Sequence, residues 1–524
     1  MSNIRNRESW GSKLGIIMAV AGSAIGLGNF LRFPVQAAQN GGGAFMIPYF
    51  ISLVLLGVPL MWVEWTIGRY GGGFGHGTAP GIFHTIWRKS RFIKYFGIIG
   101  ILGPILIYMY YVYVESWLLG FTIFSASGSL LEAANSRESM KAFLQGYQGI
   151  VHNEYFSGIG WAYLFLVITC IANSAVIYKG IRGGIEKFCK IALPVLLILG
   201  IILAIRVLTI GTPDPAHPKW NINEGLGFLW NPDFSKLASP KVWLAAAGQV
   251  FFTLSVGIGV ILTYASYLKK ADDVALSGLT AVSTNTFAEV ILGGTIVITA
   301  AYAFFGPKIA SSGAFDLGFI TMPMIFNKMA FGQIFSVIWF GLLFIAGITS
   351  SISLAQPAIA FLEDELDIDK KTAVAIFTTG TFILAQLPVF FLKNGVLDDL
   401  DFITANICLV TFALIEVLMF GWVLGIDRAW EEVHHGAQMR IPSIYKFIVK
   451  FVTPAILAII LGRWIYYNGL NTIKMAGISP ENKPVVLASR ITILLLVWGL
   501  IVMVKLAWMR KERKEQQNSK QIAD

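Results

Sequence analysis

Long apolar segments separated by short polar loops run along almost the whole chain. Examples are "MIPYFISLVLLGVPLMWV" (46–63), "IALPVLLILGIILAI" (191–205) and "ITILLLVWGLIVMV" (491–504). A helix needs about 20 apolar residues to cross a bilayer, and it is the open-ended structure that satisfies its own backbone polar groups in lipid. The pattern therefore predicts an all-α membrane protein with about twelve transmembrane helices. Their approximate positions are 11–37, 41–69, 92–124, 158–180, 188–208, 241–267, 275–304, 331–361, 372–392, 398–425, 443–468 and 484–509.

Two of these spans contain polar, glycine-rich interruptions. The first span contains "AGSAIGLGNFLRFP" (21–34), and the sixth contains "GQVFFTLSVGIGV" (248–260). Within them, "AIGLG" (24–28) and "SVGIG" (255–259) share one pattern of small, aliphatic and glycine residues. Because the two patterns lie five spans apart, two five-span units would have opposite orientations in the membrane, as an inverted repeat. The alternative is that these glycines only allow close helix packing.

A glycine-rich break inside a span has defined chemical consequences. Glycine weakens a helix by about 1 kcal/mol relative to alanine, and carbonyl groups that leave the helix need partners inside the protein. Freed carbonyl oxygens favour a cation, whereas the N-terminus of the following half-helix favours an anion. Two adjacent breaks therefore predict a site near the bilayer midplane that holds a cation and a carboxylate together.

The composition agrees with a surface that faces lipid. Of the 524 residues, 56% are hydrophobic and 13% are charged, whereas soluble domains keep about 25% charged residues. The net charge of +10 raises the alternative of a nucleic-acid-binding protein, but the basic residues are distributed among the predicted membrane loops. Their excess on one side predicts that both termini are cytoplasmic, so no nucleic-acid partner is expected.

This topology divides the chain into three parts. They are a cytoplasmic segment 1–10, a transmembrane domain 11–509 and a cytoplasmic tail 510–524; within the domain the two repeats cover 11–208 and 241–425, and additional helices cover 443–509. A cleaved signal peptide is not expected, because the first apolar stretch is long and includes the polar pattern of the first break.

No group of residues indicates catalysis. Cys170, Cys189 and Cys408 lie in or beside spans without metal-ligand spacing, which is typical of small buried apolar side chains. The six histidines lie in loops, and "GGGFG" (71–75) lacks the lysine and hydroxyl residue of a phosphate-binding loop. We therefore expect neither an enzyme nor an ATP-driven pump.

Several longer motifs go beyond this general pattern. They are "GSAIGLGNFLRFPVQAAQNGGGAFMIPY", "EWTIGRYGG", "YYVYVESW", "GQVFFTLSVGIG", "SGLTAVSTNTFAEVILGG" and "GITSSISLAQPAIAFLEDEL". Together they resemble the neurotransmitter:sodium symporters, and most of all the bacterial leucine-transporter branch. The resemblance implies twelve spans, a five-plus-five inverted repeat with unwound helices 1 and 6, and sodium-coupled transport of an amino acid.

The resemblance also implies two sodium sites. The first would consist of the Ala24 carbonyl, Asn29, Thr253, Asn285 and the carboxylate of the substrate. The second would consist of the carbonyls of Gly22, Ile25 and Ala346 with the hydroxyls of Thr349 and Ser350. Hard cations prefer oxygen ligands, and all these protein groups are neutral oxygens. Taken singly, each polar side chain is equally explained as a hydrogen bond between helices.

For the substrate, the position of Gly26 is informative. Related monoamine carriers place an aspartate there. Because this chain has no acidic residue in the break, we expect its substrate to supply its own carboxylate. The implied pocket consists of Ser23, Ala24, Gly26, Gly28, Ile107, Tyr111, Phe252, Thr253, Ser255, Ile258, Ser350, Ser353 and Leu354. Because this lining is mostly apolar and has no counter-charge, neutral and mainly hydrophobic amino acids are expected. The sequence departs from the leucine-transporter pattern at Ser23, Ile107, Ile258 and Ser353, which leaves the preferred amino acid open.

Charged residues near the span ends are implied to form gates. An outer gate would pair Arg32 with Asp401, above a lid formed by Phe252 and Tyr111. An inner gate would pair Arg7, beside Trp10, with Asp364. For Arg7 and Asp364 the alternative is an ordinary solvated charge at the end of a span.

Four glutamates lie in the predicted spans. Glu289 follows Asn285 by four residues, which places both on one helix face. Chloride-dependent relatives have serine at the Glu289 position, so a carboxylate here implies transport without chloride. For Glu64, Glu115 and Glu416 we expect structural bonds between helices.

The sequence thus favours a sodium symporter in a bacterial-type plasma (inner) membrane, with lipid, sodium and a neutral amino acid as its partners. A channel is the first alternative, because broken helices also line pores. An amino-acid sensor is the second. The oligomeric state is open, with a homodimer as one alternative.

Overall fold

The structure is a computed structural model that describes residues 8–307 and 313–523. Within these ranges every regular element is a helix, and one isolated bridge joins Gly42 to Pro232. The predicted all-α class is therefore confirmed. Arg7 lies outside the described residues.

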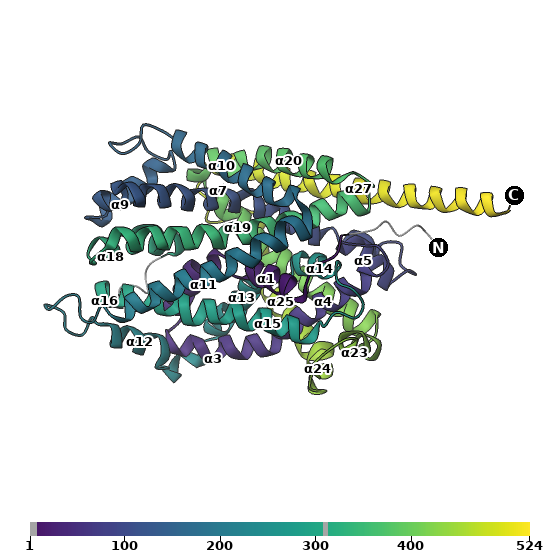
Figure 1. Ribbon diagram of the computed structural model, residues 1–524, viewed down its shortest axis with the longest axis horizontal. Coiled ribbons are helices and arrows are strands. Elements are labelled where there is room, and N and C mark those ends of the chain that lie inside the picture. Colours follow the sequence, from purple (N-terminus) through teal and green to yellow (C-terminus); the bar gives the residue numbers. More distant parts are fainter. Residues whose placement is uncertain (1–7, 308–312, 524) are drawn as a thin grey trace.

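Helices of the first half run roughly side by side along the long axis of the molecule (Figure 1). They are α1 (Lys13–Ala24), η1 (Gly28–Arg32), α2 (Phe33–Gln39), α3 (Gly43–Ser52), η2 (Leu53–Gly57), α4 (Val58–Gly72), α5 (Ala79–Ile86), α6 (Ile93–Phe96), α7 (Ile99–Ser127), α8 (Ser129–Ala133), α9 (Arg137–Tyr147), α10 (Gly160–Tyr178), η3 (Ile181–Glu186) and α11 (Lys187–Leu208). The η segments here are wide π-helical turns that continue the neighbouring helices.

The second half repeats the arrangement of long helices with short connections. Its elements are α12 (Ile222–Trp230), η4 (Phe234–Ala238), α13 (Pro240–Leu254), α14 (Val260–Ala265), α15 (Ala275–Thr286), η5 (Phe287–Thr299), α16 (Ala300–Phe305), α17 (Ala314–Asp316), η7 (Leu317–Thr321), α18 (Met322–Asn327), α19 (Gly332–Asp364), α20 (Lys370–Phe390), η8 (Leu392–Asn394), α21 (Val396–Ile403), η9 (Thr404–Cys408), α22 (Leu409–Leu418), η10 (Met419–Val423), α23 (Ile426–His434), α24 (Ile444–Phe447), η11 (Ile448–Val452), α25 (Thr453–Trp464), η12 (Ile465–Gly469), α26 (Leu470–Ile473) and α27 (Lys483–Ala523).

The described helices make this a multi-pass membrane protein. Ten of them are long and apolar enough to cross a bilayer, and α1 with the helix Gly28–Gln39 adds an eleventh span that is bent by 45°. The sixth expected span, 241–267, is divided between α13 and α14, and each piece is too short to cross alone. The count of twelve therefore stays a prediction that depends on α13 and α14 crossing together.

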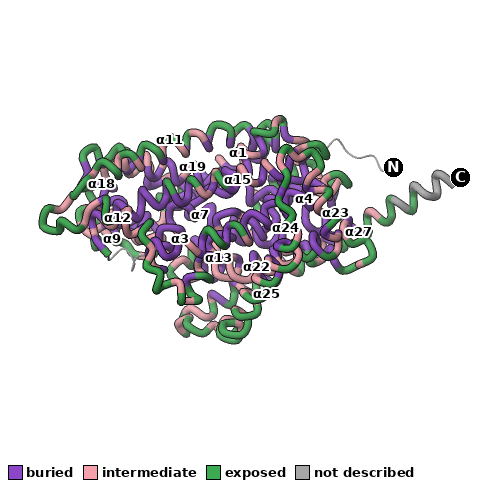
Figure 2. Tube along the Cα trace, turned by 90° about the horizontal axis from the view of Figure 1, so that it is seen from below, coloured by how far each residue is buried: buried purple, intermediate pink, exposed green. Residues whose placement is uncertain are grey.

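The core and the lipid-facing surface are distinct. α7 and α19 pack against each other inside the molecule, and buried chain is concentrated there (Figure 2). On the periphery, Ile198 and Ile205 of α11 and Leu494 and Trp498 of α27 are exposed. Large exposed apolar side chains in such numbers are expected on helices that face hydrocarbon.

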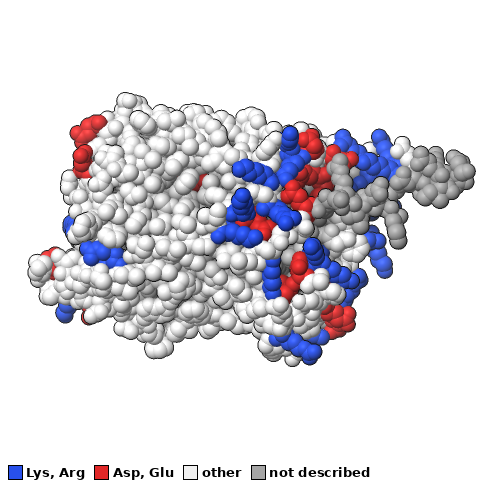
Figure 3. All heavy atoms as spheres, in the orientation of Figure 1, with Lys and Arg blue, Asp and Glu red and all other residues white. Residues whose placement is uncertain are grey.

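Charged side chains are also distributed as expected for a protein in a bilayer. On the face drawn in Figure 3, Lys, Arg, Asp and Glu gather mainly at the end where both chain termini lie, and the middle of that face has almost no charge. An uncharged belt beside a charged end is the distribution that a bilayer imposes, because charge in hydrocarbon is costly.

Candidate functional site

The first transmembrane helix is interrupted between Ala24 and Gly28. α1 ends at Ala24, Ile25 leaves the helical conformation (φ −78°, ψ 89°), and the chain becomes helical again at Gly28. All of this segment is buried. Its carbonyl and N–H groups therefore need partners from the protein or from a ligand.

Side chains supply some of these partners. Asn29 Oδ1 accepts the N–H of Gly26 at 2.9 Å, and the Tyr111 hydroxyl accepts the N–H of Leu27 at 3.3 Å. On the other side of the break, the carbonyl of Ser23 accepts the hydroxyls of Ser255, just past α13, at 3.0 Å and of Ser350 in α19 at 3.1 Å.

The sixth span is interrupted over a longer stretch. α13 ends at Leu254, and α14 begins at Val260. Between them Ser255 lies at φ 53°, Gly257 at φ 76° and Gly259 at φ 80°. Positive φ is accessible to glycine without strain, which explains why the glycines of "SVGIG" allow the chain to turn here.

Glu64 of α4 binds this second break. Its carboxylate is fully buried and accepts the N–H of Gly257 at 2.5 Å and the N–H of Leu262 at 3.3 Å. The N–H groups in the first turn of a helix have no partner within that helix. A carboxylate at this point both satisfies them and interacts favourably with the helix dipole.

Three side chains assigned to the first sodium site meet between the breaks. Asn29 Nδ2 donates to Asn285 Oδ1 at 2.8 Å, and Asn285 Nδ2 donates to Thr253 Oγ1 at 3.1 Å. All three are fully or almost fully buried. The cluster thus concentrates neutral oxygen groups in a dry region, which is the donor set that fits a hard monovalent cation.

A close contact between two backbones holds this cluster in place. A Cβ atom on Gly293 of η5 would lie 2.2 Å from the carbonyl oxygen of Asn29. Only glycine fits at this point, so the backbones of the first and seventh expected spans touch directly.

Residues assigned to the second sodium site also come together, where α1 passes α19. A Cβ on Gly22 would lie 3.4 Å from the Cβ of Thr349. The hydroxyls of Thr349 and Ser350 both donate to the Ala346 carbonyl, each at 3.1 Å. Ile25, with its backbone out of the helix, is the fifth assigned residue, and it is buried. These groups again fit a hard cation.

The expected substrate pocket adjoins the first break. A Cβ on Gly26 would lie 2.7 Å from Ser350 Oγ and 3.0 Å from the Tyr111 hydroxyl, and a Cβ on Gly28 would lie 2.8 Å from the Phe252 ring. The side chains of Ser350, Tyr111 and Phe252 thus pack directly against the two glycines, where a larger residue would displace them. No acidic side chain is present in the break itself.

The remaining assigned pocket residues are apolar or paired. Ile107, Ile258 and Leu354 are buried. The hydroxyls of Ser23 and Ser353 hydrogen-bond to each other at 2.6 Å. Because these serines already satisfy each other, neither presents an unpaired polar group.

At the expected outer gate, Arg32 and Asp401 do not form a direct ion pair. The Arg32 guanidinium lies over the Phe252 ring, 4.1 Å from its centroid, and Asp401 accepts the hydroxyl of Tyr110 at 2.8 Å. Asp401 acts on Arg32 electrostatically, but the two are not among the ion pairs within 4.0 Å that the described residues form. Tyr111 and Phe252 both lie against the first break, Tyr111 beside Gly26 and Phe252 beside Gly28.

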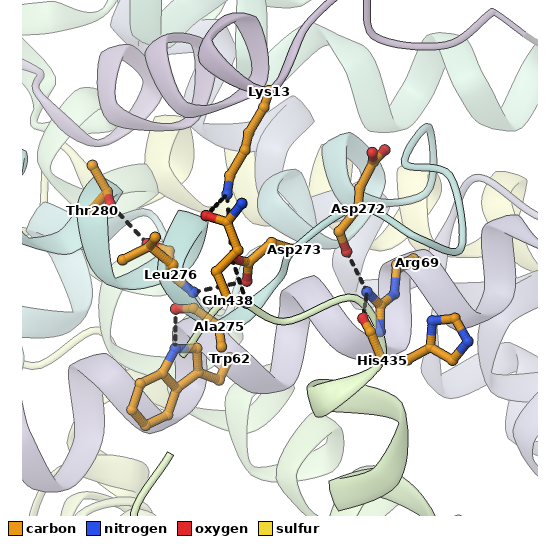
Figure 4. Close-up of polar contacts among 10 residues, drawn as sticks. All are labelled: Lys13, Trp62, Arg69, Asp272, Asp273, Ala275, Leu276, Thr280, His435 and Gln438. Carbon is orange, nitrogen blue, oxygen red and sulfur yellow. Dashed lines mark hydrogen bonds and ion pairs between the residues drawn. The ribbon is translucent and has the colours of Figure 1, made fainter. Parts of the chain in front are cut away.

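On the opposite side of the site, α1 is held by a network that the sequence did not predict. Lys13 binds Asp273 at 3.2 Å and Gln438 at 3.0 Å, and Gln438 N–H donates to Asp273 at 3.0 Å (Figure 4). The Trp10 indole donates to the Tyr264 carbonyl at 2.9 Å. The expected partner of Asp364, Arg7, is outside the described residues.

Arg69 extends this network across α4. Its guanidinium donates to the carbonyls of Asp272 at 2.5 Å and His435 at 2.9 Å (Figure 4). It also pairs with Glu432. A buried arginine at the end of an apolar span is costly unless it is paired. The arginine in "EWTIGRY" could therefore have been recognised from the sequence as a residue that needs partners. The partners could not be identified, because they lie more than 200 positions away.

A charged cavity of about 1620 Å³ lies at the end of the molecule that contains the termini. Glu365, just past α19, lines it and is bound by His76 at 2.7 Å and Lys511 at 2.5 Å. Burial alone would raise the pKa of Glu365, but His76 and Lys511 together lower it to about 2. The carboxylate therefore stays ionised at neutral pH and ties α27 to the end of α19.

Glu289 is fully buried, one helical turn after Asn285. The Tyr49 hydroxyl donates to one carboxylate oxygen, and Gln249 Nε2 donates to the other at 2.5 Å. Two donors of different helices thus converge on one carboxyl group.

Comparison with known proteins decides the family. The model of the sodium:neurotransmitter symporter family matches residues 7–139 and 131–507. The chain belongs to this family. It is a sodium-dependent transporter, and the resemblance inferred from its motifs is confirmed.

Individual relatives of this symporter agree. An uncharacterized sodium-dependent transporter of Methanocaldococcus jannaschii is 31% identical over 87% of this chain and 90% of its own length. A sodium-dependent nutrient amino acid transporter 1 of Drosophila erecta is 26% identical over 87% and 77%, respectively. Among solved structures, MhsT in complex with L-phenylalanine is 29% identical, with a TM-score of 0.74 over 87% of this chain and 99% of that one.

Proposed function

We propose that this symporter imports neutral, mainly hydrophobic amino acids together with two sodium ions by alternating access. The observation that supports this most is the meeting of Asn29, Thr253 and Asn285 beside a break that has Gly26 in place of an acidic residue. A charged substrate side chain would remain unpaired in this apolar lining, at a cost of several kcal/mol. The phenylalanine bound to MhsT and the nutrient amino acid named for the Drosophila relative support the same class.

In this proposal, the assigned residues bind two sodium ions and the charged groups of the substrate. Ala24, Asn29, Thr253 and Asn285 bind the first sodium ion, and Gly22, Ile25, Ala346, Thr349 and Ser350 bind the second. The substrate carboxylate lies against the first ion and the Tyr111 hydroxyl. Its amino group binds carbonyls near Ala24 and Phe252.

The sodium gradient supplies enough energy. One inward sodium ion gains about 1.4 kcal/mol from a tenfold gradient and about 2.3 kcal/mol from 100 mV. Two ions give roughly 7 kcal/mol per cycle by this arithmetic, which is enough to concentrate a neutral solute.

For the architecture, we propose twelve spans in which α13 and α14 together form the sixth. The first ten spans form the inverted repeat, and spans 1, 2, 6 and 7 rock against the others. Both termini are cytoplasmic and the membrane is a bacterial-type plasma membrane. The gathering of charge at the end of the molecule that contains the termini supports this orientation.

We also propose that transport needs no chloride, because Glu289 supplies a fixed negative charge between Tyr49 and Gln249. Replacement by Glu289→Ser would then make transport depend on added chloride. Uptake by that variant at the wild-type rate without chloride would contradict the proposal.

The main test is competition by the twenty amino acids for sodium-dependent binding of labelled phenylalanine to the purified protein, followed by uptake into proteoliposomes. Leucine, methionine and aromatic amino acids should compete, and internal label should exceed the external concentration. Uptake of glutamate or dopamine without uptake of neutral amino acids would overturn the substrate class. Current without substrate would indicate a channel, and binding without accumulation would indicate a sensor.

A further inference from the structure

A basic and aromatic segment, "IWRKSRFIKYF" (86–96), joins the end of α5 to α6. It contains four basic residues, and the chain has no Asp or Glu from 65 to 114. Arg88, Lys89 and Arg91 are exposed. None of these three forms an ion pair within 4.0 Å with a described residue. Their charges are therefore available to an anionic partner.

Large apolar side chains flank these charges. Phe92 is 72% exposed, Phe96 is 53% exposed and Trp87 is 41% exposed. A soluble anion would bind the cations but would leave the aromatic rings in water. A lipid supplies an anionic headgroup and an apolar layer directly below it, so it satisfies both kinds of side chain.

The segment lies where a membrane boundary is expected. The helix Ile93–Ser127 is long and apolar enough to cross a bilayer, and it begins inside the segment. α5, which precedes the segment, lies at the end of the molecule that contains the termini (Figure 1). Tryptophan at such a boundary is typical of residues that lie at the level of lipid headgroups.

Aromatic contacts orient some of the basic side chains around one space. Arg88, Arg91 and Lys94 line the charged cavity described above. The Arg88 guanidinium lies over the Phe74 ring, 5.5 Å from its centroid, and the Lys94 ammonium lies over the Trp508 ring at 4.9 Å. A ring attracts a cation without neutralising its charge, so positive charge stays concentrated on this wall of the cavity.

Acidic residues also line this cavity, but several of them already have cationic partners: Glu8 with Lys370, Glu365 with His76 and Lys511, and Asp367 with Lys514. Glu512 of α27 acts electrostatically on Lys94, which is buried. Lys94 is therefore not counted among the available charges.

We propose that the segment is a binding surface for anionic membrane lipids. Its cations bind the headgroup phosphate, and its rings lie in the layer between headgroups and hydrocarbon. Basic residues close to a membrane surface each favour anionic lipids. This lipid-binding patch consists of Trp87, Arg88, Lys89, Arg91, Phe92 and Phe96. It shares no residue with the sodium sites, the substrate pocket or the gates.

Titration of the purified protein in neutral detergent with fluorescently labelled phosphatidylglycerol and phosphatidylcholine tests the patch. The wild type should bind the anionic lipid at least about tenfold more tightly than the zwitterionic one. The triple variant Arg88→Gln/Lys89→Gln/Arg91→Gln should lose most of this preference. Because the measurement needs no sodium, substrate or transport, its result does not depend on whether the proposed function holds.

A matched control removes the same number of charges elsewhere. Lys219→Gln/Lys236→Gln/Lys241→Gln changes three exposed lysines around α12, where Glu224 and Asp233 also occur. This variant should keep the preference of the wild type. Equal loss in both triple variants would show a general charge effect and overturn the proposal, as would equal binding of the two lipids by the wild type.

The apolar part of the patch is tested with Phe92→Ser, which keeps every charge. We expect the affinity for phosphatidylglycerol to fall at least about threefold, because the most exposed ring of the patch is lost. An unchanged affinity would contradict the role of the rings. If the triple variant does not fold, Phe92→Ser still tests the patch.

Competition identifies the source of the anion. Glycerol phosphate at a concentration equal to that of the labelled lipid should not displace it. Displacement would assign the patch to a soluble anion, and tighter binding of a short DNA duplex than of the lipid would assign it to nucleic acid. Either result would overturn the proposal.

Discussion

The breaks in the first and sixth spans look alike in sequence but are stabilised in different ways. The first break is short, contains no residue with positive φ, and has its polar groups bound by neutral side chains that belong to the candidate site. The sixth break is longer, contains Ser255, Gly257 and Gly259 at positive φ, and is bound by the carboxylate of Glu64. This difference suggests that the sixth break is a fixed frame and the first break is the adjustable part of the site.

The contacts of the glycines support this division. At Gly26 and Gly28 an added Cβ would meet the side chains of Ser350, Tyr111 and Phe252, which can move. At Gly259 an added Cβ would meet backbone: the carbonyl oxygen of Gly100 lies 2.4 Å away. We therefore expect substitutions in the sixth break to lower stability, and substitutions in the first break to weaken binding.

The largest effect is expected for Gly259→Ala. The left-handed conformation costs a non-glycine residue about 1–2 kcal/mol, and the overlap with Gly100 adds about 1–3 kcal/mol. We expect a loss of about 2–5 kcal/mol in unfolding free energy, measured as a lower thermal midpoint of the purified protein. Gly248→Ala in α13 is the control, because an added Cβ there meets nothing within 4 Å. Equal midpoints for the two variants would contradict the fixed-frame interpretation.

A second loss of stability is expected for Glu64→Gln. One amide oxygen replaces two carboxylate oxygens, so the N–H of Leu262 faces an NH2 group and loses its acceptor. A hydrogen bond to a charged group contributes about 1.5–3 kcal/mol, and this is the decrease we expect in unfolding free energy. The same thermal measurement checks it, and an unchanged midpoint would show that the carboxylate is not needed at the break.

In the first break, Gly28→Ala should act on binding and leave stability nearly intact. The added methyl group would lie 2.8 Å from the Phe252 ring, which must turn into the pocket. We expect sodium-dependent phenylalanine affinity to fall about tenfold, equivalent to about 1.4 kcal/mol, with the thermal midpoint almost unchanged. A double-mutant cycle with Phe252→Leu separates the steric effect from other effects. A large stability loss without a binding defect would contradict the difference that we infer between the first and sixth breaks.

The smallest effect is expected for Ser255→Ala. Ser255 and Ser350 donate to the same Ser23 carbonyl, so losing one donor leaves the acceptor satisfied. A neutral hydrogen bond contributes about 0.5–1.5 kcal/mol, and we expect binding to weaken by less than that. Binding titrations with Ser255→Ala, Ser350→Ala and the double variant check this, since the double variant should lose more than the sum of the single losses.

Much of the fold was predictable because hydrophobic runs and glycines act locally. "AIGLG" and "SVGIG" marked the two segments where α1 and α13 end, and Gly26 indicated the absence of an acidic group. The residues that the resemblance assigned to the first sodium site, Asn29, Thr253 and Asn285, do lie together. Their role as ligands stays a prediction.

Other features depend on contacts that spacing does not encode. The resemblance paired Arg32 with Asp401, but only the structure places Arg32 over Phe252 while Asp401 binds Tyr110. The network of Lys13 and Asp273 joins positions 260 residues apart. We expected structural bonds for Glu64 and Glu115, and both form them, but which backbone Glu64 binds required coordinates.

The contact between Gly293 and the carbonyl of Asn29 has a consequence for ion choice. With no side chain between these two backbones, the sodium site that we propose around Asn29 and Asn285 cannot widen unless two whole helices separate. A site of fixed size favours the alkali ion whose radius fits it. We therefore expect lithium to replace sodium far better than the larger potassium ion does.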